Sequence, residues 1–271
     1  MQTIDFIRGI GYKVISFPDG EKHLKIDELN RKDTVAVVCR ICNSDDLFLL
    51  MQLSDILNRQ CIVVDKIIIT YLMTMRCDRL FSFEEAYSLR IVADIINSFD
   101  AKKVIIIEPH SKTSLDLIKN STPIYITGSI SSQYNFIPCF PDYGAYLRYG
   151  TLIDSKLKPI ICSKVRDVST GKLNGFEIEC KGDYEEGMEI MVMDDLCDGG
   201  GTFIGVGELL RELKPNSLSL CVTHAVQKNG IERVASVYDK VAITNSYKDW
   251  NNEALPQNIT IFTINDKLFL Q

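Results

Sequence analysis

Short apolar runs rich in β-branched residues alternate along the chain with segments whose apolar residues recur every three or four positions. The first pattern predicts buried strands and the second predicts amphipathic helices. Strands are expected at Thr34–Cys39, Lys66–Tyr71, Val104–Ile107, Pro123–Ile126, Pro159–Ser163, Glu189–Met193, Ser217–Thr223, Val241–Thr244 and Thr260–Thr263. Helices are expected at Asp45–Asn58, Phe83–Ser98, Ser114–Lys119, Phe203–Leu213 and Gly230–Ser236. This alternation predicts an α/β fold with mainly parallel sheets flanked by helices.

The alternation of strands and helices runs twice along the chain. After about residue 150 it starts again, with the predicted strand Pro159–Ser163. Two α/β domains in tandem are therefore predicted, an N-terminal domain over residues 1–145 and a C-terminal domain over residues 146–271.

The composition limits the kinds of ligand. The chain has 271 residues, of which 46% are hydrophobic, enough to build folded cores. Its net charge of −6 argues against a broad basic surface for nucleic acid or an anionic membrane, so small phosphorylated ligands are expected instead. No apolar run approaches the roughly 18 residues needed to span a bilayer, and the N-terminal residues lack the pattern of a signal peptide. A cytoplasmic protein is therefore expected.

The nine cysteines are scattered, mostly within apolar stretches, which is typical of reduced core thiols. Cys39 and Cys42 form a C-x-x-C pair, but no second ligand pair follows nearby. A metal or redox site is therefore not expected at this pair.

A glycine-rich loop carries the clearest chemistry. The predicted strand Glu189–Met193 runs into Asp194 and Asp195, and then into Asp198, Gly199, Gly200, Gly201 and Thr202 before an apolar helix begins. Consecutive glycines let backbone N–H groups wrap an anion, and the positive end of the helix dipole and the Thr202 hydroxyl add to the same point. Carboxylates accept hydrogen bonds from a sugar diol. The loop therefore predicts a ribose-phosphate site. It is not a Walker A loop, because no Gly-Lys-Ser/Thr follows the glycines.

This loop resembles the phosphoribosyl-binding loop of type I phosphoribosyltransferases and of ribose-phosphate diphosphokinases (PRPP synthetases). Taken alone, the same residues also fit a glycine-rich turn with an acidic start. Two predicted domains favour the PRPP synthetases, because an ordinary transferase has one. The resemblance implies two tandem phosphoribosyltransferase-like domains, with ATP-side loops in the first and the ribose-phosphate loop in the second.

Two segments of the first half resemble ATP-binding loops of PRPP synthetases. The segment Phe17-Pro18-Asp19-Gly20-Glu21 resembles a loop that reaches the adenine of ATP on a neighbouring subunit. The resemblance assigns Phe17, Asp19 and Glu21 to ATP binding and implies a homo-oligomer, a dimer or higher. It also assigns Arg76, Asp78 and Arg79 to the triphosphate, for which guanidinium groups supply forked donors. As bare sequences, the first segment is a turn and the second a solvated charged loop.

Four further segments follow in the order found in that family. His110 and Asp142 resemble ligands of a Mg²⁺ ion that bridges the phosphates of ATP, and His110 is also assigned to ATP binding. Lys164 and Arg166 resemble the start of the catalytic loop, whose cations neutralise the transferred group. Val222–Ala225 resembles a strand end of the second domain. A strand-end histidine and a Lys-x-Arg sequence are common without function, so their order along the chain carries the resemblance.

The resemblance implies ATP-dependent transfer of a diphosphate to the anomeric hydroxyl of a ribose, with Mg²⁺ as cofactor, ATP as co-substrate and AMP as product. Relatives usually place a hydroxyl residue after the third acidic position, where this chain has Gly199, Gly200 and Gly201. A loop of glycines leaves more room around the phosphate, so two sugar acceptors remain possible. The first is ribose 5-phosphate, which gives PRPP. The second is a 5-substituted ribose such as ADP-ribose, as in phage-type relatives that rebuild NAD.

Two other classes of protein remain open. A phosphoribosyltransferase that consumes PRPP would have no use for the Arg76–Arg79, His110 and Lys164–Arg166 segments. A non-catalytic, regulatory relative of PRPP synthetases would tend to carry altered catalytic loops, whereas this chain keeps both cations, Lys164 and Arg166.

Overall fold

The computed structural model describes residues 1–30, 34–131, 136–153, 156–166 and 173–264, which form two compact units. The first unit is Met1–Ile124 and the second is Tyr125–Gln271. The division lies between residues 124 and 125, whereas the sequence pattern placed it between 145 and 146. The physical reason is the strand β8 (Ile137–Phe140), which pairs with strands of the second unit.

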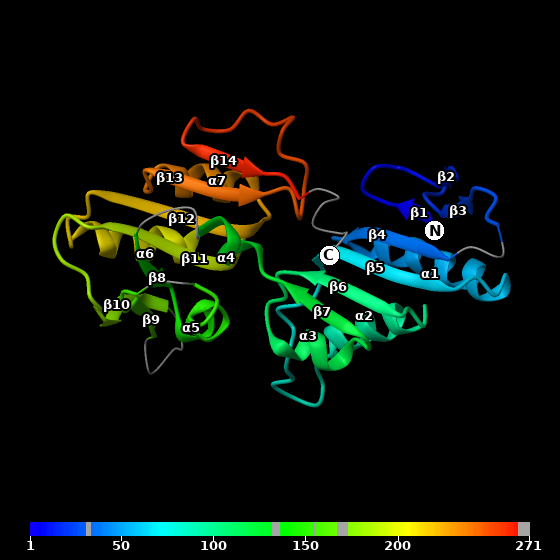
Figure 1. Cartoon of the computed structure of the whole chain (residues 1–271), viewed down its shortest axis with the longest axis horizontal. Helices are drawn as coiled ribbons and strands as arrows, with labels where there is room; N and C mark the ends of the chain where they lie inside the picture. Colours follow the sequence, from blue (N-terminus) through cyan, green and yellow to red (C-terminus); the bar gives the residue numbers. More distant parts are fainter. Residues whose placement is uncertain (31–33, 132–135, 154–155, 167–172, 265–271) are drawn as a thin grey trace. The chain divides into compact units, whose positions relative to one another are not determined.

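The first unit is built on a parallel sheet (Figure 1). Its strand order is β1-β4-β5-β6-β7, where β1 is Gln2–Asp5, β4 Val35–Ile41, β5 Val64–Leu72, β6 Lys103–Ile107 and β7 Ser121–Ile124. The helices are α1 (Ser44–Arg59), α2 (Ser88–Asn97) and α3 (Lys112–Leu117). A hairpin of β2 (Tyr12–Ser16) and β3 (Lys22–Ile26) lies beside α1. The central strands are buried on both faces, as continuous apolar runs require.

The second unit contains a longer mixed sheet. Its strand order is β10-β9-β8-β11-β12-β13-β14, with β9 at Ile160–Arg166, β10 at Leu173–Cys180, β11 at Glu189–Cys197, β12 at Ser217–Ala225, β13 at Lys240–Thr244 and β14 at Ile259–Phe262. The pair β9 and β10 is antiparallel, and the other pairs of this sheet are parallel. The helices are α4 (Ile126–Ser131), α5 (Tyr143–Tyr149), α6 (Gly201–Arg211) and α7 (Lys228–Ala235).

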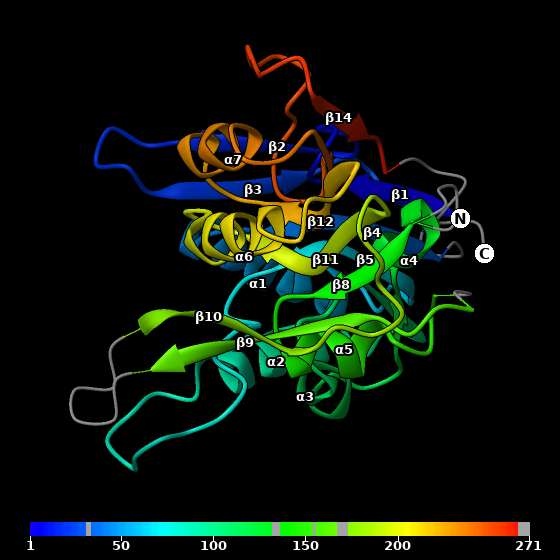
Figure 2. The same cartoon turned by 90° about the vertical axis from the view of Figure 1, so that its left-hand side faces the viewer.

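Helices cover both faces of this second sheet. Apolar residues of α6 and α7 share a core with alternate residues of β11 and β12, such as Val192 and Val222. The residues between them face the other way, where Cys221 contacts Thr127 of α4. Figure 2 shows α6 and α7 on one side of the strands and α4 on the other. The predicted α/β fold with mainly parallel sheets flanked by helices is therefore confirmed.

Every predicted strand and helix overlaps an element of the structure, but four strands beyond β1 were not predicted. They are the hairpin β2–β3, the short β8 and the edge strand β10. The hairpin strands are largely exposed, and β10 is a polar edge strand that contains Gly175 at a φ of 129°. Such strands lack the long apolar run on which the prediction depends, because their neighbours in the sheet supply the burial and the pairing.

Candidate functional site in the second unit

The acidic pair lies at the carboxyl end of β11, as predicted from the sequence. Asp194 Oδ1 and Asp195 Oδ1 are each 2.9 Å from the same guanidinium nitrogen, NH1 of Arg148 on α5. All three side chains are mostly buried, with 15%, 2% and 10% exposure for Asp194, Asp195 and Arg148. Burial raises the pKa of Asp194 well above its ordinary value of 3.8 and the Asp195 charge adds to this, whereas Arg148 lowers the pKa. The pair is thus a buried, cation-bound acceptor group.

The glycine loop follows this pair and begins α6. Gly200 caps the helix with a φ of 79°, a left-handed conformation that favours glycine. The loop packs closely on α7, since a Cβ at Gly230 would lie 2.0 Å from Asp198 O. At Gly199 and Gly201, by contrast, an added Cβ would meet no heavy atom within 4 Å. The helix N-terminus therefore faces open space, where an anion is favoured by the backbone N–H groups and the dipole.

Two side chains fix the loop from the outside. Gln227 Nε2 donates to Asp198 Oδ1 at 2.7 Å, and Arg233 NH1 donates to Gly199 O at 3.2 Å. Arg233 projects from α7, which also supplies Gly230. The glycine loop is therefore held in place by residues about thirty positions further along the chain as well as by its own glycines.

Asp142 and Lys164 form a second polar cluster of this unit. The Asp142 carboxylate caps α5 by accepting from Ala145 N at 3.0 Å, and its other oxygen is 3.2 Å from Lys164 Nζ. Both side chains are about one-third exposed. Arg166 ends β9, but its side chain lies outside the described residues, as does the loop 167–172 that follows it. Asp142 and the acidic pair are linked through α5, which carries Asp142 at its start and Arg148 in its last turn.

A buried network of hydroxyl groups supports the ends of the strands beside β11. Thr127 and Thr223 lie 2.9 Å apart through their hydroxyl oxygens, and the hydroxyls of Thr244 and Ser246 donate to Thr223 O. His224 Nδ1 lies 2.8 Å from Ser246 Oγ. All five side chains are fully buried. The Val222–Ala225 segment thus serves as rigid support in the described residues.

Candidate nucleotide-binding residues in the first unit

The second group of predicted residues lies at the carboxyl ends of β5 and β6. Asp78 Oδ1 accepts from Arg79 Nε at 3.2 Å. Burial would raise the pKa of Asp78, but the side chains of Ser111 and Arg79, with the charges of Arg79 and His110, outweigh it and lower the pKa below 3.8. The segment Arg76–Arg79 and the His110–Ser111 turn are therefore brought together, as parallel neighbouring strands require. Arg76 and Arg79 are exposed.

Backbone strain marks the same two strand ends. Thr74, after β5, has a φ of 62°, and Glu108, after β6, has a φ of 47°. Left-handed conformations are uncommon for residues other than glycine and concentrate at functional sites. The two strand ends thus share this uncommon backbone conformation with Cys61, Asp100, Asn120 and Lys214.

Phe17, Asp19 and Glu21 lie in the tight turn of the β2–β3 hairpin. Phe17 N donates to Glu21 O at 2.8 Å, Glu21 N donates to Asp19 Oδ1 at 3.0 Å, and the Phe17 side chain is 45% exposed. The turn therefore exposes an aromatic ring and two acidic residues to its surroundings.

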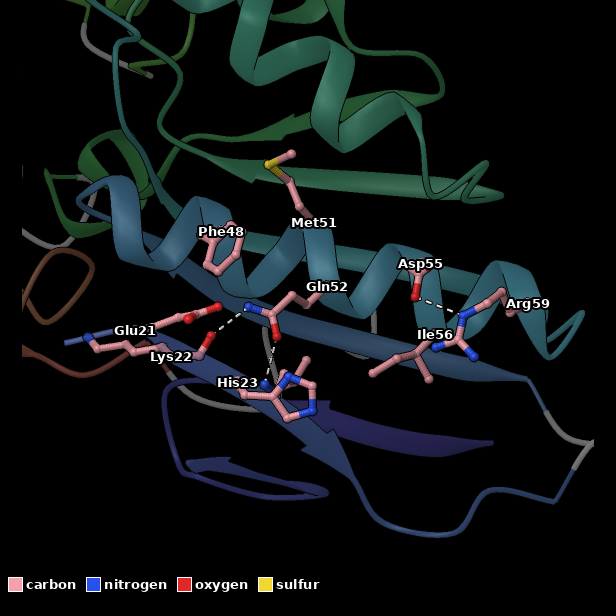
Figure 3. A pocket seen from close by; sticks show the side chains of 10 residues that line it. Glu21, Lys22, His23, Phe48, Met51, Gln52, Asp55, Ile56 and Arg59 are labelled. Carbon is pink, nitrogen blue, oxygen red and sulfur yellow. Dashed lines mark hydrogen bonds and ion pairs between the residues drawn. The ribbon is translucent and has the colours of Figure 1, made fainter. Parts of the chain in front are cut away.

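A groove of about 450 Å³ lies between this hairpin and α1 (Figure 3). Gln52 crosses it from α1, accepting from Leu24 N at 2.7 Å and donating to Lys22 O at 2.9 Å, and Arg59 pairs with Asp55 at 2.8 Å. The two Gln52 bonds pair backbone groups of Lys22 and Leu24 on β3. The groove is thus a seam that holds the hairpin, and with it the Phe17–Glu21 turn, against α1.

The predicted metal ligands His110 and Asp142 belong to different units. Among the residues that the structure describes, no three His, Cys, Asp or Glu side chains gather as a metal site would. Mg²⁺ commonly uses one or two protein carboxylates together with substrate phosphates and water, and the Asp142 carboxylate suits such an arrangement. For Cys42, burial raises the pKa to about 12, so this thiol of the C-x-x-C pair stays protonated near neutral pH.

Sequence reasoning missed Arg148, Gln227 and Arg233. No helix was predicted around Arg148, so its contacts with residues 46 and 47 positions away gave no signal in the sequence. Gln227 and Arg233 gave no signal either, because their contacts depend on how α7 packs beside the loop.

Relation to known proteins

Comparisons with known proteins find ribose-phosphate pyrophosphokinases. No protein-family model matches the sequence. The ribose-phosphate pyrophosphokinase of Thermococcus kodakarensis is 24% identical over 254 residues, covering 89% of this chain and 89% of its own. That of Campylobacter jejuni is 28% identical over 263 residues, covering 92% of this chain and 82% of its own.

The chain is thus similar to ribose-phosphate pyrophosphokinases over most of its length. The crystal structure of phosphoribosylpyrophosphate synthetase from Mycobacterium smegmatis shares the fold, with a TM-score of 0.77 at 20% identity over 95% of this chain and 87% of that one. These similarities indicate an enzyme of the pyrophosphokinase type. Its described helices include none with the length and apolar character needed to cross a membrane.

Proposed function

We propose that this pyrophosphokinase transfers a diphosphate from Mg-ATP to the anomeric hydroxyl of a ribose that carries a 5-phosphate group, and releases AMP. The observation that carries the proposal is the acidic pair Asp194–Asp195 set directly before an open glycine cradle on β11 and α6. Carboxylates accept from sugar hydroxyls and the helix N-terminus attracts phosphate, so the two halves of a ribose phosphate have matching partners.

In the proposed reaction, the anomeric oxygen forms a bond to the β-phosphorus of ATP while the bond to the oxygen that leaves with AMP breaks. The hydroxyl proton is lost to solvent. Asp194 and Asp195 orient the sugar, and Gly199–Thr202 hold its 5-phosphate. Lys164 and Arg166 neutralise charge on the transferred group, which is how phosphoryl transfer is mostly accelerated. Phe17, Asp19, Glu21, Arg76, Asp78, Arg79 and His110 are assigned to ATP.

The resemblance assigns Mg²⁺ to His110 and to Asp142, and when bound the ion would neutralise charge on the phosphates of ATP. The Asp142 carboxylate also pairs with Lys164 at 3.2 Å.

The acceptor is proposed to be either ribose 5-phosphate or a ribose whose 5-phosphate continues into a second group, such as ADP-ribose. Open space at Gly199 and Gly201 supports the second alternative. A hydroxyl side chain at either position would narrow this space, whereas glycine leaves room for a phosphate with a further substituent.

The test is AMP release by the purified protein from ATP, with ribose 5-phosphate and ADP-ribose offered separately and the sugar product weighed by mass spectrometry. AMP and a diphosphate adduct are expected with Mg²⁺ and not with excess chelator. The isosteric variant Asp195→Asn is the matched control and should lose most activity, because it replaces one acceptor oxygen by a donor.

An adduct on ribose 5-phosphate alone would mean that the protein acts as an ordinary PRPP synthetase. An adduct on ADP-ribose would mean that its acceptor is a 5-substituted ribose. If neither acceptor yields AMP, the proposal is wrong. Incubation with PRPP and nucleobases would then test a phosphoribosyltransferase, and inactivity there as well would favour a regulatory protein.

A further inference from the structure

Arg148 is a buried cation of the second unit, and the sequence reading gave it no role. One of its nitrogens lies 2.9 Å from Asp194 Oδ1 and 2.9 Å from Asp195 Oδ1, and its side chain is 10% exposed. Its guanidinium also lies 5.4 Å from the centre of the Tyr149 ring. Both carboxylates are thus oriented by one guanidinium group that is itself held by packing.

The contact joins elements that are far apart in the sequence. Arg148 is in the last turn of α5, whereas Asp194 and Asp195 are 46 and 47 positions further on, at the end of β11. A buried ion contact of this kind is geometrically demanding and is sensitive to the loss of either partner. It therefore fixes the direction in which the two carboxylates point.

We propose that Arg148 is a positioning residue that holds Asp194 and Asp195 so that they accept hydrogen bonds directly from the vicinal hydroxyls of ribose, without an intervening metal ion. The identity of the sugar rests on the proposed function. Arg148 binds the Oδ1 atoms of both residues through one nitrogen. These two atoms are therefore occupied by the guanidinium, which would also repel a cation brought beside them. Neutral hydroxyl donors meet no such repulsion.

The proposal predicts a particular kinetic signature. Loss of Arg148 should raise the KM for the sugar acceptor, because the acceptor oxygens lose their orientation. It should leave the KM for ATP nearly unchanged, because ATP is assigned to other residues. A residue with only a structural role would instead lower the amount of folded enzyme and alter neither KM selectively.

The experiment measures binding of ribose 5-phosphate by calorimetry without ATP, in chelator and then in Mg²⁺. Wild type, Arg148→Met and Arg148→Lys are compared with Arg211→Met, a control that removes an arginine paired with Asp239 at the surface of the same unit. Wild type is expected to bind in chelator. Arg148→Met should bind at least tenfold more weakly, Arg148→Lys should be intermediate, and the control should match wild type.

Two results would overturn the inference: unchanged affinity in a cooperatively melting Arg148→Met variant, or wild-type binding that appears only when Mg²⁺ is added. Wild type that binds no ribose phosphate in either buffer would count against the proposed function itself, and the inference would fall with it. If Arg148→Met does not melt cooperatively, the kinetics of Arg148→Lys decide. A rise of threefold or more in the KM for the acceptor alone is expected, and no rise, or an equal rise in the KM for ATP, would contradict it.

Discussion

The left-handed glycine of the loop after β11 gives a quantitative test of the structure. Gly200 has a φ of 79°, and a Cβ there would lie 2.8 Å from Gly230 O and 2.8 Å from Val234 Cγ2. In Gly200→Ala, the left-handed backbone costs about 1–2 kcal/mol. Forcing a methyl group into a packed contact costs about 1–3 kcal/mol more. The free energy of unfolding should therefore fall by roughly 2–5 kcal/mol.

The two flanking glycines supply matched controls. Neither Gly199 nor Gly201 has a left-handed backbone, and an added Cβ would meet no heavy atom within 4 Å at either. Gly199→Ala and Gly201→Ala should therefore change the free energy of unfolding by only about 0.5 kcal/mol. The Gly201 methyl would nevertheless stand where the phosphate is expected, so this variant should keep its stability and bind ribose 5-phosphate more weakly.

The assay is thermal unfolding followed by circular dichroism. A change of 1 kcal/mol shifts the Tm of a domain of this size by roughly 2–4 °C, so Gly200→Ala should melt roughly 4–20 °C below wild type. The controls should melt close to wild type. If Gly200→Ala and Gly199→Ala melt at the same temperature, the left-handed cap and its close approach to α7 are wrong.

Two further predictions concern charged pairs of the second unit. Asp239 accepts two hydrogen bonds from Arg211 and one from Leu218 N, and the Arg211 bonds are the main cause that lowers the pKa of Asp239 below 3.8. Because the folded pKa is the lower one, this stabilisation is present above pH about 4 and is lost as the pH falls through the folded pKa. The Tm gap between wild type and Asp239→Asn should therefore shrink in acid, and a gap that is constant with pH would contradict the argument. Lys164→Met should lower kcat by about 100-fold or more and change the free energy of unfolding by less than about 1 kcal/mol, since its pair with Asp142 is partly exposed. The kcat and the thermal unfolding of Lys164→Met are compared with those of Lys214→Met, which changes an exposed lysine. If the two variants have the same kcat, Lys164 takes no part in the transfer step.

The sequence predicted the central strands because each is a continuous apolar run, which indicates a strand buried on both faces. Residues such as Ile67–Ile69 and Ile105–Ile107 are almost fully buried and leave no other location for such a segment. The strand β8 was missed because it has four residues, one of them Pro138, and becomes a strand only between β9 and β11. This omission also moved the predicted domain boundary.

The glycine loop was predictable because its chemistry is local. Asp194, Asp195 and Gly200 are near one another in the sequence, and a strand followed by glycines and a helix has few ways to arrange them. The charge partner Arg148 was not predictable, because it reaches the pair from a helix 46 positions away. The same holds for Arg233, which contacts Gly199 O from α7.

By itself, the sequence determined the alternation of strands and helices and the resemblance to pyrophosphokinases, and it predicted a phosphate site at the loop after β11. Each of these depends on residue types and on spacings of a few positions. Only the tertiary structure decided which cation orients the acidic pair, which glycine of the loop has a left-handed backbone and that Asp142 pairs with Lys164. These facts depend on contacts between distant segments, and such contacts are fixed by the packing of helices on a sheet and not by the order of residues along the chain.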